Sequence, residues 1–431
     1  MDRETAEPQV ESFPGDRARE WAEYHSDVAA TTTYVYEFVW DVTADAEGPF
    51  CTDVDGNVLM DFTSHVAAAP LGYNNPKLMD RLEAFDLVDP LKIAGQDFYV
   101  GSPGGPEDPE IPSPTQLMDR ITDLTDHYDL DTVFLSNSGA EAVENAIKAC
   151  YDDTGGHRAV GFRGAFHGRT LGALSLNRSK HAQRKGFPEI AGVTTVPYSE
   201  EGITELRSML HPEKGHLPAE DVAYVIVEPM QGEGGYRFPD KSMLAELGEI
   251  CTEYDINLIA DEIQSGLGRT GEWWGADHYP IEPDVITSAK GLRVGATIAN
   301  EETFPDERGR LSSTWGAGDV IASLQGVATI DAIHEYDLVS HAGEVGRTFR
   351  EKLEDANLAN AVDVRGRGLM LAVEFDTKDR REAIVENCLK RGLLTLGCGY
   401  KTLRLLPPLD VTEREVELAV DLLAEAADEA A

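Results

Sequence analysis

The sequence predicts an α/β fold with a large domain, whose mainly parallel sheet lies between helices, and a smaller α+β domain. Three observations lead to this prediction. Short apolar runs alternate with helical segments between residues 132 and 290. The runs are continuously apolar, which is typical of parallel strands that are buried on both faces. The last hundred or so residues instead place longer helices around two strand-like segments.

The first 75 residues are polar and then strand-like. A strand is expected over residues 34–42. Residues 50–66 predict a hairpin that turns at Asp55-Gly56, since Asp-Gly is a favoured hairpin turn. Residues 101–114 (GSPGGPEDPEIPSP) are rich in glycine and proline, so they predict an irregular loop with a possible functional role.

The large domain is expected to contain strands wherever aliphatic and β-branched residues run together. One helix is predicted over residues 139–153 and another over 241–255. The predicted strands cover residues 132–136, 158–162, 193–198, 222–228, 256–262 and 284–290.

The C-terminal part has a different pattern, in which helices are predicted over residues 320–356, 379–391 and 411–430. They surround strand-like segments at 362–375 and 402–409. Such a mixture predicts a separate, smaller α+β unit.

The composition limits the partners of this chain. The 431 residues include 37 Lys+Arg and 78 Asp+Glu, which gives a formal net charge of −41. An acidic surface of this kind repels nucleic acids and anionic membranes, so neither is an expected partner. The N-terminus lacks the apolar segment of a signal peptide, and the five cysteines have no Cys-x-x-Cys spacing. A cytoplasmic protein without a zinc site or a disulfide framework is therefore predicted.

A dinucleotide-binding loop is the first alternative to exclude. Gly266, Gly268 and Gly271 form a literal Gly-x-Gly-x-x-Gly after an apolar run. A Rossmann loop needs an amphipathic helix directly after these glycines. The residues that follow, Glu-Trp-Trp-Gly at 272–275, have no helical apolar spacing, so a dehydrogenase is not expected.

A phosphate site is predicted at the start of the helix over residues 139–153. Ser138, Gly139 and Ala140 lie between a strand end and this helix, where free N–H groups and the helix dipole favour an anion. Taken alone, the segment is better explained by an ordinary N-cap at Ser138. Phe166 and His167 follow the next strand, and Phe166 offers an aromatic face.

Charged and polar side chains follow other predicted strands. Arg169 can clamp a carboxylate with two parallel hydrogen bonds. Glu228 ends a strand, and Glu233 lies in the glycine loop behind it. Asp261 ends another strand, at the edge where open α/β sheets bind ligands, and Gln264 follows it closely.

Lys290 directly follows another apolar run. A partly buried lysine can form a Schiff base with an aldehyde. A buried Asp261 needs a cation opposite it, and a protonated pyridine nitrogen would supply one. Pyridoxal phosphate as the cofactor explains all four features together: the phosphate site, the aromatic face, the carboxylate and the lysine.

The chain resembles the class-III (ω-amino acid) aminotransferases of the fold-type-I pyridoxal phosphate enzymes, from residue 53 to residue 417. The motifs that carry the resemblance are NSGAEAVENAIK, GAFHGRT, EPMQGEGG, IADEIQSGLGRTG, VITSAKGL, RGRGLML and RLLPPL. It implies a homodimer with shared active sites and a small domain built from both chain ends. The expected parts are 1–75 for the N-terminal segment of the small domain, 76–325 for the large cofactor-binding domain and 326–431 for the C-terminal small domain.

The resemblance also implies a role for each cofactor residue. Lys290 carries the cofactor as a Schiff base, and Asp261 is the partner of the pyridinium nitrogen. Gln264 lies beside the ring oxygen, and Phe166 stacks on the ring. The phosphate is held by the helix start together with Thr314 from the other subunit. The complete predicted cofactor set is Ser138, Gly139, Ala140, Phe166, His167, Glu228, Asp261, Gln264, Lys290 and Thr314.

Four further residues are assigned to the substrate in the same way. Arg169 holds the carboxylate at the far end of the substrate. Glu233 and Arg404 form a gate pair, whose arginine is released to bind an α-carboxylate in the second half-reaction. Val66 stands where the ornithine enzymes carry tyrosine, which speaks against ornithine as the substrate.

The chain departs from the family after Thr314. The usual Gly-Gly-Asn-Pro run is replaced, so that Gly318 stands at the asparagine position and Asp319 at the proline position. This feature and the short 290–314 segment favour the lysine ε-aminotransferases, whereas residues 183–198 resemble archaeal 4-aminobutyrate enzymes.

The predicted reaction therefore moves the terminal amino group of a 4-aminobutyrate- or lysine-like substrate to 2-oxoglutarate, with ping-pong kinetics. Lysine 6-aminotransferase, ornithine aminotransferase and an amino acid racemase remain alternatives.

The acidic coat predicts a halophilic protein. The screening length falls from about 10 Å at 0.1 M salt to about 3 Å at 1 M. Concentrated salt therefore removes the self-repulsion of a net charge of −41. We expect the protein to unfold when salt is dialysed away, as measured by circular dichroism, with a neutral osmolyte as control. Stability that does not depend on salt would contradict this prediction.

Overall fold

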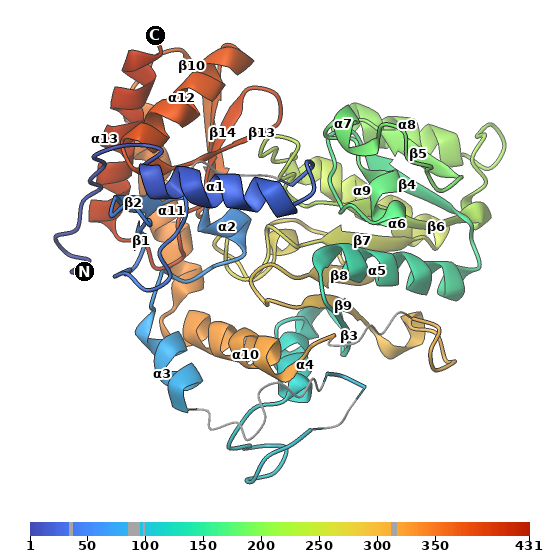
Figure 1. The fold of residues 1–431 in the computed structure, drawn as a ribbon. Coiled ribbons are helices and arrows are strands. Elements are labelled where there is room, and N and C mark those ends of the chain that lie inside the picture. Colours follow the sequence, from blue (N-terminus) through green and yellow to red (C-terminus); the bar gives the residue numbers. More distant parts are fainter. Residues whose placement is uncertain (34–37, 85–94, 98–99, 312–316) are drawn as a thin grey trace. The chain divides into compact units, whose positions relative to one another are not determined.

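The computed structural model describes residues 1–33, 38–84, 95–97, 100–311 and 317–431. The chain divides into two compact units (Figure 1). Unit 1 comprises Met1–Pro76 and His341–Ala431, and unit 2 comprises Lys77–Ser340. Both units combine a sheet with helices, as the α/β prediction requires.

Unit 2 contains a seven-stranded sheet in the order β3-β9-β8-β7-β6-β4-β5. All six predicted strands are confirmed, with slightly shorter ends. β9 was not predicted, because glycine and alanine make up most of its GATIA sequence. The strands are β3 (Thr132–Ser136), β4 (Arg158–Phe162), β5 (Val193–Val196), β6 (Val222–Val227), β7 (Asn257–Asp261), β8 (Val285–Ser288) and β9 (Gly295–Ala299).

The strand directions in this sheet place one set of strand ends together. β4 pairs in parallel with β5 and β6, and β7 pairs in parallel with β6 and β8. β9 is antiparallel to both β8 and β3, so β3 again runs in the common direction. Every strand except β9 therefore ends at the same edge of the sheet, where ligands bind in open α/β folds.

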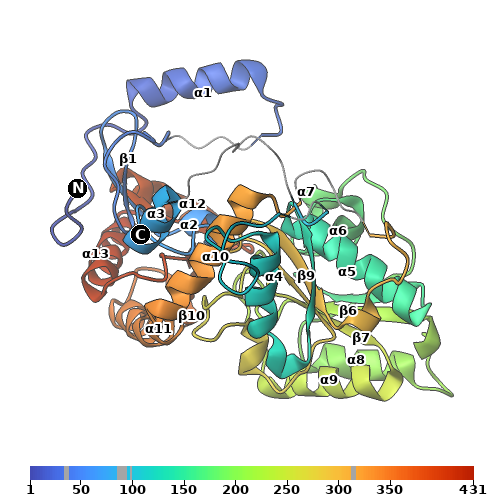
Figure 2. The same ribbon diagram turned by 90° about the horizontal axis from the view of Figure 1, so that it is seen from below.

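Helices cover both faces of this sheet (Figure 2). α5 and α6 lie on one face, where Ile147 of α5 packs in one apolar core with Ile226 and Ile259 of the strands. α8 and α9 lie on the other face. The helices of unit 2 are α3 (Pro76–Ala84), α4 (Pro114–Asp123), α5 (Gly139–Thr154), α6 (Leu171–Leu176), α7 (His181–Arg184), α8 (Glu200–Leu210), α9 (Lys241–Tyr254) and α10 (Val320–Glu335).

The departure from the family pattern after Thr314 is compatible with a regular start of α10. Gly318 has a φ of +59°, a left-handed conformation that glycine adopts without strain. The Asp319 side chain caps α10 by accepting a hydrogen bond from the Ala322 N–H at 3.1 Å. Aspartate is a favoured N-cap residue, so this sequence begins the helix by capping it.

The Gly-x-Gly-x-x-Gly stretch does not form a dinucleotide-binding loop. Turns follow the glycines, and the next element is a short 3-10 helix, η3 (Gly275–His278). The loop is held by the buried Glu262, which follows β7. Its carboxylate accepts hydrogen bonds from the Ser265 hydroxyl and from the backbone N–H groups of Gly275 and Ala276.

Unit 1 contains two smaller sheets. The hairpin at Asp55-Gly56 is confirmed: β1 and β2 pair antiparallel, and Gly56 has a φ of +89°. The predicted strand over residues 34–42 lies partly outside the described residues, and within 38–42 only an isolated bridge from Trp40 to Asp53 is found. The strands are β1 (Phe50–Thr52), β2 (Val58–Asp61) and β12 (Leu393–Leu394) in one sheet, and β10 (Ala361–Arg367), β11 (Met370–Phe375), β14 (Thr402–Leu405) and β13 (Leu396–Cys398) in the other.

The helix predicted over residues 320–356 is two helices, and this prediction was wrong. α10 ends at Glu335, and α11 begins at Leu338. Asp337 between them has a φ of +51°, which breaks the helical hydrogen-bond pattern. The helices that belong mainly to unit 1 are α1 (Asp16–Val28), α2 (Ser64–Ala67), α11 (Leu338–Asp355), α12 (Lys378–Lys390) and α13 (Glu413–Glu429).

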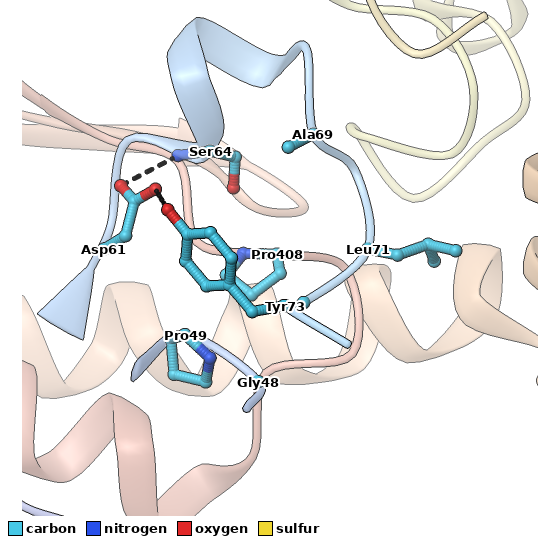
Figure 3. A pocket seen from close by; sticks show the side chains of 9 residues that line it. Gly48, Pro49, Asp61, Ser64, Ala69, Leu71, Tyr73 and Pro408 are labelled. Carbon is cyan, nitrogen blue, oxygen red and sulfur yellow. Dashed lines mark hydrogen bonds between the residues drawn. The ribbon is translucent and has the colours of Figure 1, made fainter. Parts of the chain in front are cut away.

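The segment labelled α2 is a left-handed turn. The φ angles from Ser64 to Ala67 lie between 42° and 67°, a conformation that costs free energy, above all for the β-branched Val66. Asp61 holds the start of the turn by accepting a hydrogen bond from the Ser64 N–H at 3.2 Å and, on its other oxygen, one from the Tyr73 hydroxyl at 3.1 Å (Figure 3). A small pocket beside Asp61 and Tyr73 is lined by no residue of the predicted cofactor or substrate sets.

No helix within the described ranges is long and apolar enough to cross a lipid bilayer.

Removing the Glu262 carboxylate should destabilise unit 2. Three buried donors lose their acceptor in Glu262→Ala, so we expect a loss of about 2–4 kcal/mol in a chemical denaturation experiment. Burial raises the pKa of Glu262 from 4.5 to about 7. The folded state therefore holds this proton more tightly than the unfolded chain, and stability falls as the pH rises through that window.

The exposed Glu272 provides the matched control, since Glu272→Ala removes a carboxylate from the same loop without burying a donor. Glu262→Ala should also reduce the decrease of the free energy of unfolding with rising pH. Equal stability of the two variants would show that Glu262 does not hold the loop.

Candidate active site

The predicted cofactor residues of unit 2 meet at the carboxyl edge of its sheet. Phe166 and His167 follow β4, Glu228 follows β6, and Asp261 ends β7. Asp261 is the register partner of Thr287 in the neighbouring strand β8. Lys290 lies shortly after that strand, is partly buried, and stands at the same edge.

Asp261 is buried and paired. Its Oδ2 lies 2.7 Å from Nδ1 of His167, and its Oδ1 accepts a hydrogen bond from the Ile263 N–H at 3.2 Å. The side chains of Asp261 and His167 are 4% and 0% exposed. A buried carboxylate is stable when it is hydrogen bonded, and here Nδ1–H of the imidazole donates to it. The sequence placed both residues near the cofactor but gave no sign that they contact each other.

Glu228 connects two loops at this edge. Its Oε1 accepts a hydrogen bond from the Phe166 N–H and its Oε2 accepts one from the Gly232 N–H, both at 2.9 Å. Burial raises the pKa of Glu228 to about 7, the nearby His167 lowers it, and Asp261 raises it further. Glu228 is thus one buried acid that positions both the loop of Phe166 and the glycine loop of Glu233.

The start of α5 has the geometry of an anion site. Ser138 caps the helix by accepting a hydrogen bond from the Glu141 N–H at 3.2 Å. The ordinary N-cap that the sequence offered as an alternative is therefore present. The backbone N–H groups of Gly139 and Ala140 nevertheless donate to no acceptor among the described residues. Capping and anion binding are therefore compatible, because the cap uses one N–H and leaves two.

Close packing of glycines brings this helix start against the other loops. A Cβ on Gly139 would lie 2.8 Å from Cδ1 of Ile263. A Cβ on Gly168 would lie 2.8 Å from Cβ of Ala140, and Gly168 has a φ of +137°. The start of α5 therefore touches both the segment after Asp261 and the loop of Phe166, and side chains at these two positions would push them apart.

Buried polar atoms at this edge need a further partner. His167 Nε2, Gln264 Oε1 and Thr287 Oγ1 are buried and form no hydrogen bond within the described part of the chain. Buried polar groups in proteins are almost always satisfied, so a polar ligand is expected here. Pyridoxal phosphate fits this set, because Asp261 would accept a hydrogen bond from a ring N–H, Gln264 would meet a ring hydroxyl, and the α5 start would bind a phosphate.

The predicted substrate residues are placed more widely. Arg169 is exposed and forms no ion pair with any described residue. Glu233 lies in the glycine loop, and its Oε2 is 3.0 Å from Nζ of Lys180, a contact that was not predicted. Val66 and Arg404 belong to unit 1, where Arg404 is buried in β14.

Thr314 lies outside the described residues.

Comparison with known proteins identifies similar chains. The family model "Aminotransferase class-III" matches residues 35–427. The acetylornithine aminotransferase of Archaeoglobus fulgidus is 34% identical over 382 residues, which cover 88% of this chain and 93% of that protein. The ornithine aminotransferase of Oceanobacillus iheyensis is 31% identical over 399 residues, covering 89% of this chain and 93% of that protein. The solved structure of a lysine aminotransferase from M. tuberculosis has a TM-score of 0.85 and 25% identity, and the match covers 96% of this chain and 100% of that chain.

The packing of Gly168 against the start of α5 generates a prediction. Gly168→Ala places a Cβ 3.0 Å from Cα of Ala140 and strains a backbone with a φ of +137°, so the helix start must move. We expect the apoprotein to bind pyridoxal phosphate roughly tenfold more weakly, a loss of about 1.4 kcal/mol, in a fluorescence titration.

Gly161→Ala in β4 is the control, because its nearest contact would be an ordinary 3.8 Å to Leu176. If both variants bind the cofactor like the unmodified protein, the α5 start does not hold the phosphate.

Proposed function

The chain belongs to the class-III aminotransferases, and we propose that it transfers the terminal amino group of an ω-amino acid to 2-oxoglutarate, giving a semialdehyde and glutamate. One observation carries this proposal for the site. The buried Asp261 is paired with His167 at 2.7 Å, beside the strand that leads to Lys290. This arrangement places a fixed negative charge and an amine at one edge of the sheet.

The cofactor is pyridoxal phosphate, which supplies an aldehyde for the amine and a ring that withdraws electrons. Asp261 holds the proton on the ring nitrogen, since a carboxylate in a site of low dielectric strongly favours a cation beside it. His167 orients Asp261 through its Nδ1. Phe166 would stack on the ring, and Gln264 would bind the ring hydroxyl.

Lys290 has two tasks in this proposal. Its Nζ would hold the cofactor, and the same amine would act as the base that moves the proton of the substrate carbon bearing the amino group. The phosphate binds to the N–H groups of Gly139 and Ala140, with Thr314 from a second subunit of a homodimer. The shared phosphate site is the reason for proposing that the active form is a dimer.

The two substrates use one site in turn, which implies ping-pong kinetics. Arg169, exposed and without an ion pair among the described residues, is available for the far carboxylate. Glu233 and Arg404 act as the gate, in which Arg404 binds the α-carboxylate of 2-oxoglutarate once Glu233 releases it. Val66 borders the donor side of the site.

The donor that we propose first is 4-aminobutyrate-like or lysine-like. Support comes from Gly318 and Asp319, from the 183–198 segment, and from Val66 in place of a tyrosine. A second candidate is ornithine or N-acetylornithine, because two relatives above 30% identity are named for these substrates. Loss of chirality without transfer of nitrogen would instead identify a racemase.

We also propose a cytoplasmic location in a halophilic organism. All five cysteines are buried and free, which suits a reducing compartment. The net charge of −41 suits high salt.

A panel of amino donors with 2-oxoglutarate tests the function. We expect 15N from a 4-aminobutyrate- or lysine-like donor to appear in glutamate, and the holoprotein to lose its yellow colour with borohydride. Lys290→Ala should lower turnover by roughly 10²–10⁴-fold or more, because proton transfer loses its base. Lys352→Ala, a surface lysine paired with Glu417, is the control. Nitrogen transfer that survives in Lys290→Ala would refute the role of this lysine.

A further inference from the structure

We propose that Asn177 is a positioning residue for the cofactor site, because its side chain fixes the backbone of the loop that holds the His167 imidazole against Asp261. The inference deepens the proposed function, since it rests on His167 and Asp261 together serving the ring of pyridoxal phosphate. All residues that carry it belong to unit 2. Asn177 lies outside the motifs of the family resemblance, and its role follows from two hydrogen bonds of its side chain.

The loop of residues 164–168 gains little rigidity from its own sequence. Gly164 and Gly168 lie at its two ends, with φ angles of +84° and +137°. Glycine reaches such conformations freely, so the two glycines place little restraint on the residues between them. The position of His167 must therefore be set by contacts from outside the loop.

The Asn177 side chain supplies two of these contacts. Its Oδ1 accepts a hydrogen bond from the His167 N–H at 2.6 Å, and its Nδ2 donates to the carbonyl of Gly168 at 2.7 Å. The side chain is completely buried, so water cannot take its place. Truncation at this position would leave a buried N–H and a buried carbonyl of the loop without these partners, which is costly.

The backbone of Asn177 is itself held in place. Nη1 of Arg178 donates to the carbonyls of Ser175 and Asn177, at 2.9 and 2.7 Å, and so closes the end of α6. Near the start of α6, the Ala173 N–H donates to Oε1 of Glu144 in α5 at 3.0 Å. The carboxamide therefore extends from a short helix that is held at both ends, and it can impose its geometry on the loop.

The His167 imidazole depends on this support. Its Nδ1 lies 2.7 Å from Oδ2 of Asp261, whereas its Nε2 is buried and has no hydrogen-bond partner within the described part of the chain. A shift of the backbone at residue 167 would therefore remove the donor from Asp261. A buried carboxylate with fewer donors is stabilised less in its charged form, and the charged form is the one that favours a protonated ring nitrogen.

A purely structural role is the alternative, and Ser175 provides the comparison. It is a second buried polar side chain of α6. Its hydroxyl donates to the carbonyl of Leu171 at 2.7 Å and accepts a hydrogen bond from the Ile190 N–H at 2.8 Å. Neither group belongs to the loop of residues 164–168. Both side chains thus stabilise the surroundings of α6, but only Asn177 bonds to His167.

The test uses the full chain without cofactor, labelled with 15N-histidine, and the variants Asn177→Ala, Asn177→Asp and Ser175→Ala. NMR detects the Nδ1–H of His167, since a buried proton between an imidazole and a carboxylate is protected from exchange. The signal is assigned by its absence from His167→Gln. The Kd of pyridoxal phosphate is measured by fluorescence titration of the same proteins. Asn177→Ser, too short to reach both partners, replaces Asn177→Ala if that variant does not fold.

We expect Asn177→Ala to lose the His167 signal and to bind the cofactor roughly five- to tenfold more weakly. Ser175→Ala should lower the thermal midpoint to a similar extent but keep the signal and the Kd. Asn177→Asp retains an acceptor of the same length for the His167 N–H, so it should keep the signal. In the His167→Gln background, Asn177→Ala should change the Kd by less than about twofold, since the side chain through which it acts is gone.

Three results would overturn the proposal. They are an unchanged signal or cofactor affinity in Asn177→Ala, equal losses of affinity in Asn177→Ala and Ser175→Ala, and an undiminished effect of Asn177→Ala in the His167→Gln background. None of these measurements uses an amino donor. A protein that meets the expectations for Asn177 but transfers no nitrogen would refute the proposed function alone, so the two failures are distinguishable.

Discussion

The proposed cofactor site, at the carboxyl edge of the seven-stranded sheet, depends on one buried carboxylate. Asp261 ends β7 with almost no exposure, and a charge in that position is stable only with partners. Nδ1 of His167 is one partner, at 2.7 Å, and the ring nitrogen of the cofactor is the proposed second one. The same arrangement that stabilises Asp261 in the fold therefore prepares it for the cofactor.

Glu228 extends this constraint to the loops. It accepts the N–H of Phe166 on one oxygen and that of Gly232 on the other, so one side chain holds both the loop of Phe166 and the loop that carries Glu233. Burial raises the pKa of Glu228 to about 7. Because Gly139 packs tightly against Ile263 and Gly168 against Ala140, the start of α5 is also held against these loops.

The Lys180–Glu233 pair differs from the Asp261–His167 pair in its exposure to solvent. Asp261 and His167 are buried, whereas Lys180 and Glu233 are partly open to solvent. Buried pairs hold one geometry, and exposed pairs exchange partners at little cost. In the proposed function, one site binds two different substrates in turn, which calls for a fixed interaction at the ring and an exchangeable one at the carboxylates.

The sequence by itself determined six strands of unit 2 and the helices α5 and α9, because continuous apolar runs and helical apolar spacing are local signals. It also determined the candidate residues at the strand ends, since parallel strands must end at one edge. It did not reveal β9, whose small residues carry no strand signal, or the break at Asp337, which depends on a left-handed residue between two helices. Only the tertiary structure decided that His167 contacts Asp261, that Glu228 joins two loops and that Lys180 meets Glu233. The contacts of His167 with Asp261, Phe166 with Glu228 and Lys180 with Glu233 join residues far apart in the chain, and no local pattern encodes them.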